Sequence, residues 1–174
     1  MSHHQITLSD NKPTREGSVR TSGYIAVGRS GSNAYSNSSA TGFTAGSQLY
    51  FYDTNPVNEI GGATITSSSN WVESVTLPAG VYTIDLCFGA EFSASGYMQF
   101  APYISSTAQP SNGSCGASAT HERGASIAQA FIELGSSTTI TFNVYASSNV
   151  DSVANQGTTP SQESWFLIRK TTKQ

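Results

Sequence analysis

Residues 77 to 89 read Leu77-Pro78-Ala79-Gly80-Val81-Tyr82-Thr83-Ile84-Asp85-Leu86-Cys87-Phe88-Gly89. Pro78 presets its own φ and Gly80 accepts the positive φ of a type II turn, so this run predicts a turn that leads into a strand. Past the turn, every second residue is large and apolar, which predicts a strand with one buried face. These residues are Tyr82, Ile84, Leu86 and Phe88. The run therefore indicates a β-sheet core and no helical scaffold.

Short apolar or alternating runs continue along the chain, separated by turn residues such as those of Asp53-Thr54-Asn55-Pro56. We expect strands at residues 23–28, 47–52, 63–66, 70–77, 81–92, 97–105, 138–145 and 164–169, and loops at 29–46 and 109–123. Several short strands with turns between them are typical of a β-sandwich or barrel.

One segment, residues 125–134, fits two patterns. Ile127, Phe131 and Leu134 have the spacing of a helix face. In a strand, alternate residues from Ala128 to Leu134 share one face instead. We favour a strand because the neighbouring segments are strands, and Gly135 ends either structure.

The composition limits the classes of protein to which the chain can belong. Charged residues make up only 11% of the 174 residues, against about 25% in an average globular chain. This neutral, polar composition is common in secreted and virion proteins. With a net charge of −3 the chain has no basic stripe for phosphates, so we expect no nucleic-acid partner. No apolar run reaches the roughly 20 residues of a membrane span, and we expect neither a membrane nor a Sec signal.

The N-terminus differs from the rest, and we divide the chain into an extended arm, residues 1–20, and a β-sandwich domain, residues 21–174. The arm is polar and cannot bury itself. Its short β-prone patch is Ile6-Thr7-Leu8, which can add a strand to the edge of a partner's sheet. Its cations Lys12, Arg15 and Arg20 can pair with carboxylates of that partner.

The histidines do not indicate a catalytic site. His3 and His4 lie in the arm, where a tag remnant or a solvated position explains them, and His121 lies in a loop beside Glu122 and Arg123. The sequence contains no nucleophile elbow, zinc-ligand spacing or phosphate-binding loop. We therefore predict that the protein is not an enzyme and has no catalytic residues, metal or cofactor.

Two sets of acidic and amide residues were weighed as alternatives. Asp85, Glu73 and Glu91 fall on or beside strands, where outward, solvated carboxylates are a simpler interpretation than a glycosidase acid pair. The loop residues Asp53, Asn55 and Asn58 can hold calcium, but a turn explains them equally well.

The two cysteines, Cys87 and Cys115, lie in an expected strand and an expected loop. They can form a disulfide in an oxidising compartment, and the sequence leaves their redox state open.

Three motifs in a fixed order resemble a known family. They are Leu77-Pro78-Ala79-Gly80-Val81-Tyr82, then Phe131-Ile132-Glu133-Leu134-Gly135-Ser136-Ser137-Thr138-Thr139-Ile140-Thr141-Phe142, and the last strand, Ser164-Trp165-Phe166-Leu167-Ile168-Arg169-Lys170. This order resembles the jelly roll of tumour necrosis factor (TNF) and of the globular heads of complement and collagen-like proteins. The resemblance covers residues 24–170 by motif order, with little residue identity. It implies an all-β, two-sheet jelly-roll sandwich.

In that family the Gly-x-Tyr strand and the C-terminal strand are neighbours in the inner sheet, which makes a three-fold trimer interface. The resemblance thus implies a homotrimer whose interface includes Tyr24, Tyr82, Phe131 and Trp165. The alternative is a monomeric sandwich in which these aromatic side chains fill the core.

Jelly rolls of this kind also occur in bacteriophage virions. By analogy, we expect a non-enzymatic, trimeric capsid decoration or cement subunit, located in the virion after assembly in the host cytoplasm, whose arm binds the major capsid protein or another virion protein. The alternative is a tail-fibre tip or lectin-like receptor-binding head that recognises cell-surface glycans through residues 29–46 and 109–123. A eukaryotic signalling ligand is a weaker third interpretation.

Overall fold

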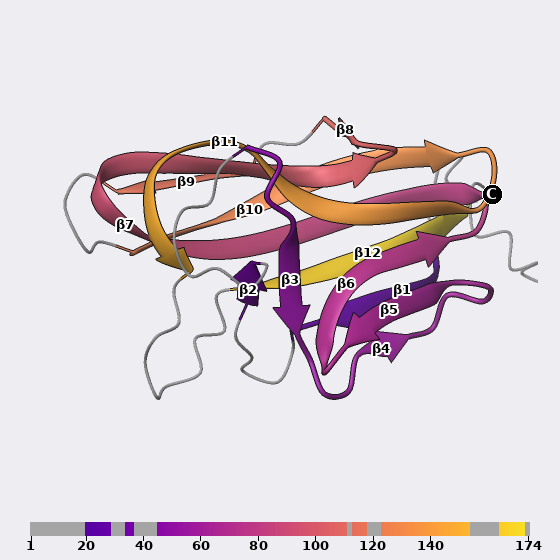
Figure 1. Ribbon diagram of the computed structural model, residues 1–174. Coiled ribbons are helices and arrows are strands. Elements are labelled where there is room, and N and C mark those ends of the chain that lie inside the picture. Colours follow the sequence, from indigo (N-terminus) through magenta and orange to yellow (C-terminus); the bar gives the residue numbers. More distant parts are fainter. Residues whose placement is uncertain are drawn as a thin grey trace, which may run out of the picture.

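The computed structural model describes residues 20–28, 34–36, 45–110, 113–117, 123–153 and 164–172. Within these ranges all regular structure is β-strand (Figure 1). The strands are β1 (Arg20–Val27), β2 (Ala34–Ser36), β3 (Leu49–Tyr52), β4 (Val57–Asn58), β5 (Thr64–Ser68), β6 (Trp71–Leu77), β7 (Gly80–Ile104), β8 (Thr107–Ala108), β9 (Gly113–Ala117), β10 (Arg123–Leu134), β11 (Thr138–Val153) and β12 (Trp165–Thr172).

The long strand β7 bends and takes part in both layers of the sandwich (Figure 1). Its first part, residues 80–92, lies between β12 and β10, and β1 and β4 continue beyond β12. This layer is called sheet I. The second part, residues 96–104, pairs with β11 and β9, and β6, β5, β3 and β2 continue beyond β11. This layer is called sheet II. All of these pairings are antiparallel.

The order of strands in sheet I is that of the jelly roll the motifs resemble. The Gly-x-Tyr strand, β7, and the C-terminal strand, β12, are direct neighbours, with Ile84 opposite Ile168 and Leu86 opposite Phe166. The predicted all-β, two-sheet jelly-roll sandwich is confirmed.

Phenylalanine rings from both sheets form the centre of the core. Phe51 of sheet II packs edge-on against Phe88 and Phe166 of sheet I, with ring centroids 6.1 and 5.1 Å apart. Such edge-to-face contacts stabilise beyond the area they bury. The predicted apolar face of β7 is confirmed, since the side chains of Tyr82, Ile84, Leu86 and Phe88 are all buried.

Two local predictions change, and one open choice is settled. Residues 92 and 97 belong to one continuous strand, because β7 bends where two separate strands were expected. Gly80 has a φ of 155°, far from the value near +80° of a type II turn, so the predicted turn type is wrong. Residues 125–134 lie in β10, which confirms the strand interpretation.

The predicted loop 109–123 contains a strand, β9, which pairs with the second part of β7. Its sequence, Gly-Ser-Cys-Gly-Ala, has no apolar alternation that would reveal it. Small residues are needed here because sheets I and II approach closely: a Cβ on Gly113 would lie 2.5 Å from the Cβ of Ala128 in β10.

Candidate functional site

The solvent-facing side of sheet I is the candidate functional site, and we call it the sheet I face. Register pairing arranges its side chains in rows across β10, β7, β12 and β1. The rows, read in that order, are Glu133-Val81-Thr171, Phe131-Thr83-Arg169-Tyr24, Gln129-Asp85-Leu167-Ala26 and Ile127-Cys87-Trp165.

Two large apolar side chains of β10 stand out on this face. Ile127 is 53% exposed and Phe131 is 66% exposed. The alternate residues Ala128 and Ala130 point into the core and are buried. In this half of β10 the larger apolar residues therefore face away from the core, which is the reverse of what a strand covered on one side requires.

The other end of the face is hollow. Tyr24, Trp165 and Leu167, all half-buried, line an open depression of about 500 Å³ over β1 and β12. Gly28 contributes to its floor, where a Cβ would lie 2.6 Å from the carbonyl oxygen of Ser164. Apolar side chains surround a hollow that an apolar side chain of a partner can fill.

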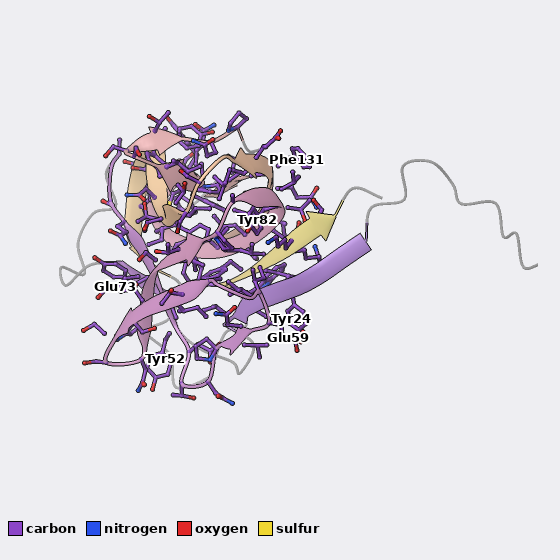
Figure 2. All side chains as sticks on the ribbon, turned by 90° about the vertical axis from the view of Figure 1, so that its right-hand side faces the viewer. Tyr24, Tyr52, Glu59, Glu73, Tyr82 and Phe131 are labelled. Atoms are coloured by element: carbon purple, nitrogen blue, oxygen red, sulfur yellow. The ribbon has the colours of Figure 1, made fainter. Side chains whose placement is uncertain are left out.

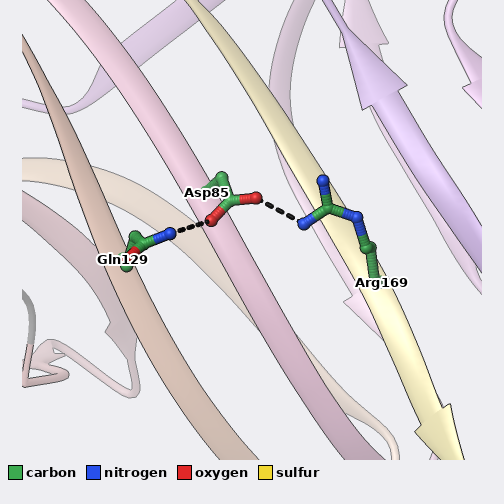
Figure 3. Close-up of polar contacts among 3 residues, drawn as sticks. All are labelled: Asp85, Gln129 and Arg169. Atoms are coloured by element: carbon green, nitrogen blue, oxygen red, sulfur yellow. Dashed lines mark hydrogen bonds and ion pairs between the residues drawn. The ribbon is translucent and has the colours of Figure 1, made fainter. Parts of the chain in front are cut away.

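A short polar network crosses the centre of the face (Figure 3). Asp85 accepts a hydrogen bond from Gln129 Nε2 at 3.0 Å through one carboxylate oxygen, and the other oxygen pairs with Arg169 Nη1 at 2.5 Å. The side chain of Asp85 is only 15% exposed and that of Arg169 is 40% exposed. The central charge is thus neutralised inside the chain, so a neutral partner can cover it with both groups still paired.

Three of the four residues expected at a trimer interface lie on this face. Phe131 is strongly exposed, and Tyr24 and Trp165 are half-buried. Tyr82 points the other way: its side chain is fully buried, and its hydroxyl donates to the carbonyl of Pro78 at 2.8 Å. Figure 2 shows Tyr82 inside the molecule and Phe131 at its margin. The expectation that Tyr82 is an interface residue is therefore wrong, since residues 81 and 83, not 82, face outward in this strand.

Sequence reasoning missed Ile127, Leu167 and the Asp85–Arg169 pair as members of this face. The signal was present for Ile127, because a strand that buries Ala128 and Ala130 must turn Ile127 and Phe131 outward. The Asp85–Arg169 pair joins residues that are far apart in sequence, and only the pairing of β7 with β12 brings them together.

The proposed arm contacts fall largely outside the described residues. Ile6, Thr7, Leu8, Lys12 and Arg15 are all among residues 1–19, and their roles stay predictions. Arg20 begins β1, where it is opposite Thr172, so the sandwich starts at this residue. The predicted glycan-binding loops are described only in part, and His3, His4 and His121 lie outside the described residues.

Asp53 and its neighbours form a turn. Asp53 is buried, and its carboxylate accepts hydrogen bonds from the backbone N–H groups of Gly28 and Asn55, both at 2.8 Å. These bonds occupy both oxygens, which favours the turn over the calcium site. In the parts of the chain that the structure describes, no three His, Cys, Asp or Glu residues gather as metal ligands would.

The cysteines lie in different parts of the fold. Cys87 is buried in the first part of β7, opposite Ile127 and Trp165, whereas Cys115 lies in β9 opposite Met98. Their pairing stays open. Among the described residues, no helix has the length and apolar character needed to cross a bilayer.

No protein-family model and no curated protein matches this chain. Among solved structures, crystal structures of murine APRIL at pH 8.5, 8.0 and 5.0 are similar to it, with TM-scores of 0.47, 0.46 and 0.44 and identities of 14, 10 and 12%. They cover 85, 84 and 87% of this chain and 98, 98 and 99% of their own. The strand pairing described above carries the fold assignment: the chain has a TNF-like jelly-roll fold.

Proposed function

We propose that this protein is a non-enzymatic structural subunit of a virion that forms a homotrimer through the sheet I face and decorates the capsid. The observation that carries the proposal is the outward apolar side of β10, where Phe131 and Ile127 are more than half exposed. Large apolar side chains that are exposed on one face of a sheet indicate an interaction site.

The size of the sheet I face suits association. Four strands about 4.8 Å apart and four rows about 6.8 Å apart cover on the order of 500 Å². A stable interface buries about 800 Å² per partner, and the smallest specific ones bury about 500–600 Å² per partner. A face of this size, extended by flanking residues of β1 and β10, meets the lower bound for a specific contact.

The chemistry of the face favours a second copy of the chain as its partner. Asp85 and Arg169 neutralise each other, and Glu133 is the one other charged residue in the four rows, so the centre of the face attracts neither a strongly acidic nor a strongly basic partner. The exposed Phe131 side and the hollow beside Trp165 provide a projection and a depression on one surface. When the projection of one copy fits the depression of the next, the contact is head-to-tail. Such contacts close into a trimeric ring if each copy is rotated by a third of a turn relative to its neighbour.

The virion role is supported by composition and by the arm. A surface with few charges and many Ser, Thr, Gly and Asn residues is common in virion proteins. In the trimer, the sheet I face would be buried and the rest of this surface would face solvent. The arm has no apolar segment long enough to fold alone, and Ile6, Thr7 and Leu8 supply a strand that a capsid sheet edge can accept. Lys12 and Arg15 would then pair with acidic groups of the capsid.

The trimer is tested by the mass of the full chain in solution, measured by light scattering over a range of concentrations. We expect three copies for the native chain and a monomer for the double variant Ile127→Ser/Phe131→Ser. The matched control is Tyr145→Ser, which removes a partly exposed aromatic side chain from sheet II and should remain trimeric. A native chain that stays monomeric at high concentration overturns the proposal.

The capsid role is tested separately with the same trimer. Removal of residues 1–19 leaves β1 intact and should abolish binding to capsids of the virus that encodes the chain. A truncated trimer that binds these capsids as well as the full chain rules out the arm as the attachment element.

A further inference from the structure

A second candidate site lies on the solvent-facing side of sheet II. A depression of about 860 Å³ is formed where the turn between β7 and β8, the turn between β10 and β11, and residues 46–48 meet. Its wall includes Tyr103, Ser105, Ser106, Ser137, Thr141 and Asn143. These residues come from segments that are distant in sequence, and the pairing of β7 with β11 places Tyr103 opposite Thr141.

The chemistry of this depression is that of a site for a neutral ligand. Among the described residues that line it, none carries an acidic, basic or imidazole side chain, and apart from Tyr103 and Gly46 all are Ser, Thr, Asn or Gln. Hydroxyl and carboxamide groups both donate and accept hydrogen bonds. A ligand with many hydroxyl groups, which also donate and accept, matches this lining better than an anion or a cation does.

Part of the lining is already held in place by internal hydrogen bonds. Thr141 Oγ1 donates to Asn143 Oδ1 at 2.8 Å, and Asn143 Nδ2 donates to the Gly46 carbonyl at 3.2 Å. Groups fixed before binding lose less conformational freedom when a ligand arrives.

The two-residue turn between β7 and β8 has serine at both central positions. Ser105 and Ser106 have φ values of 47° and 66°, a conformation that hairpin turns usually assign to Asn and Gly. Both side chains line the depression and are exposed. The turn therefore holds two hydroxyl groups at the wall of the depression.

Tyr103 supplies the one aromatic surface of the depression. It is half-buried, and its pKa is raised by burial and then by the nearby Tyr145 hydroxyl, which places a second aromatic side chain beside it. Aromatic rings with one polar end suit sites where one part of a ligand is apolar and another is hydrated. The C–H side of a sugar ring and its hydroxyl groups have this double character.

We propose that this depression binds a neutral saccharide, with one sugar ring packed on Tyr103 and its hydroxyl groups bonded to Ser105, Ser106 and Asn143. The site is formed within one chain and lies on the sheet opposite the sheet I face. The inference therefore does not depend on the trimer or on the capsid role. It places glycan recognition on sheet II rather than in the loops where the sequence predicted it.

The first test applies the full chain to an array of neutral oligosaccharides, with sialylated and sulfated ones beside them. We expect saturable binding to at least one neutral structure. The soluble form of that oligosaccharide is then titrated into the native chain and its variants by calorimetry. Silence across the neutral glycans, or binding to the anionic glycans alone, overturns the proposal.

The deciding variant is Ser105→Gly/Ser106→Gly. Glycine accepts positive φ without strain, so this variant should fold at least as well as the native chain while lacking both hydroxyl groups. We expect about tenfold weaker binding, and an equal or larger loss for Tyr103→Ala. Unchanged affinity in the double glycine variant contradicts the proposal even if Tyr103→Ala fails to fold.

The matched control is Tyr97→Ala, which removes an exposed tyrosine from the same strand but from outside the depression. Its affinity should equal that of the native chain. The double variant Ile127→Ser/Phe131→Ser should also bind one soluble oligosaccharide per chain with native affinity. Loss of binding in either control would place the ligand elsewhere.

Discussion

Sheet I and sheet II expose surfaces of opposite chemistry, and the strands β10 and β11 show the contrast most directly. In β11, buried Ile140, Phe142 and Val144 alternate with outward Thr139, Thr141 and Asn143, as expected for a strand with water on one side. In β10, small Ala128 and Ala130 face the core, while large Ile127 and Phe131 face outward. The comparison shows that the outward side of β11 is polar at these three positions, whereas the outward side of β10 carries two large apolar side chains.

The two sheets share one core. Weakening that core should have the largest effect on the free energy of unfolding. Phe51→Ala removes a ring that contacts Phe88 and Phe166 of sheet I and Phe142 of sheet II. We expect the free energy of unfolding to fall by about 3–5 kcal/mol. Chemical denaturation followed by circular dichroism measures it in a single transition. Two separate transitions would show that the sheets are independent, and would break the comparison.

A polar link between the sheets should rank second. The carboxylate of Asp53 joins Gly28, at the end of β1, to Asn55, just after β3. Asp53→Ala leaves two backbone N–H groups without their acceptor, which should lower the free energy of unfolding by about 2–3 kcal/mol. Asp53→Asn keeps one acceptor oxygen and should cost about half as much. Equal stability of all three chains would show that the link is not needed.

A smaller effect tests whether the sheet I face is covered. In an isolated chain the pair of Asp85 and Arg169 is partly hydrated and should contribute about 0.5–1 kcal/mol. In a trimer that buries the face, Asp85→Asn leaves Arg169 unpaired, and association should weaken at least tenfold.

The double variant Asp85→Asn/Arg169→Gln removes both charges and should recover most of the association. Sedimentation at several concentrations measures all four members of this cycle. The cycle gives a coupling free energy between Asp85 and Arg169. If that coupling is no greater in the oligomer than in the monomer, the partner binds elsewhere.

The smallest effect compares a tyrosine of each sheet at alkaline pH. Burial raises the pKa of Tyr82 in sheet I and of Tyr103 in sheet II above the usual 10.0. Below pH 10 the folded and unfolded chains both keep these protons. Above it the unfolded chain loses them first, so stability should fall as the pH rises through the folded pKa.

Tyr82→Phe should flatten this alkaline decline, measured as the denaturation midpoint from pH 9 to 11. Tyr103→Phe should also flatten the decline. A bound saccharide should make the part of the decline that is due to Tyr103 steeper, and should leave the part due to Tyr82 unchanged. If neither variant changes the decline, other titrating groups cause it.

The alternation of residues along β7 was sufficient to predict its buried face, because side chains of a strand point to opposite sides whatever surrounds it. The family resemblance that the three motifs carry implied that β7 and β12 are neighbours, as the structure has them. The orientation of Tyr82 was available from the same alternation, yet its large aromatic side chain suggested an interface. The strand β9 gave no local signal, because its residues are small and Gly113 is required by the close approach of Ala128 in β10.

Local physical chemistry thus established strands, their apolar sides and an all-β class, since these follow from periodicities within a few residues, and the family resemblance implied the two-sheet jelly roll. The register between distant strands was decided only by tertiary packing. That register pairs Asp85 with Arg169, turns Phe131 into solvent and gathers Tyr103, Ser106 and Asn143 around one depression. Contacts between segments far apart in sequence depend on how the whole core packs, and no local pattern encodes them.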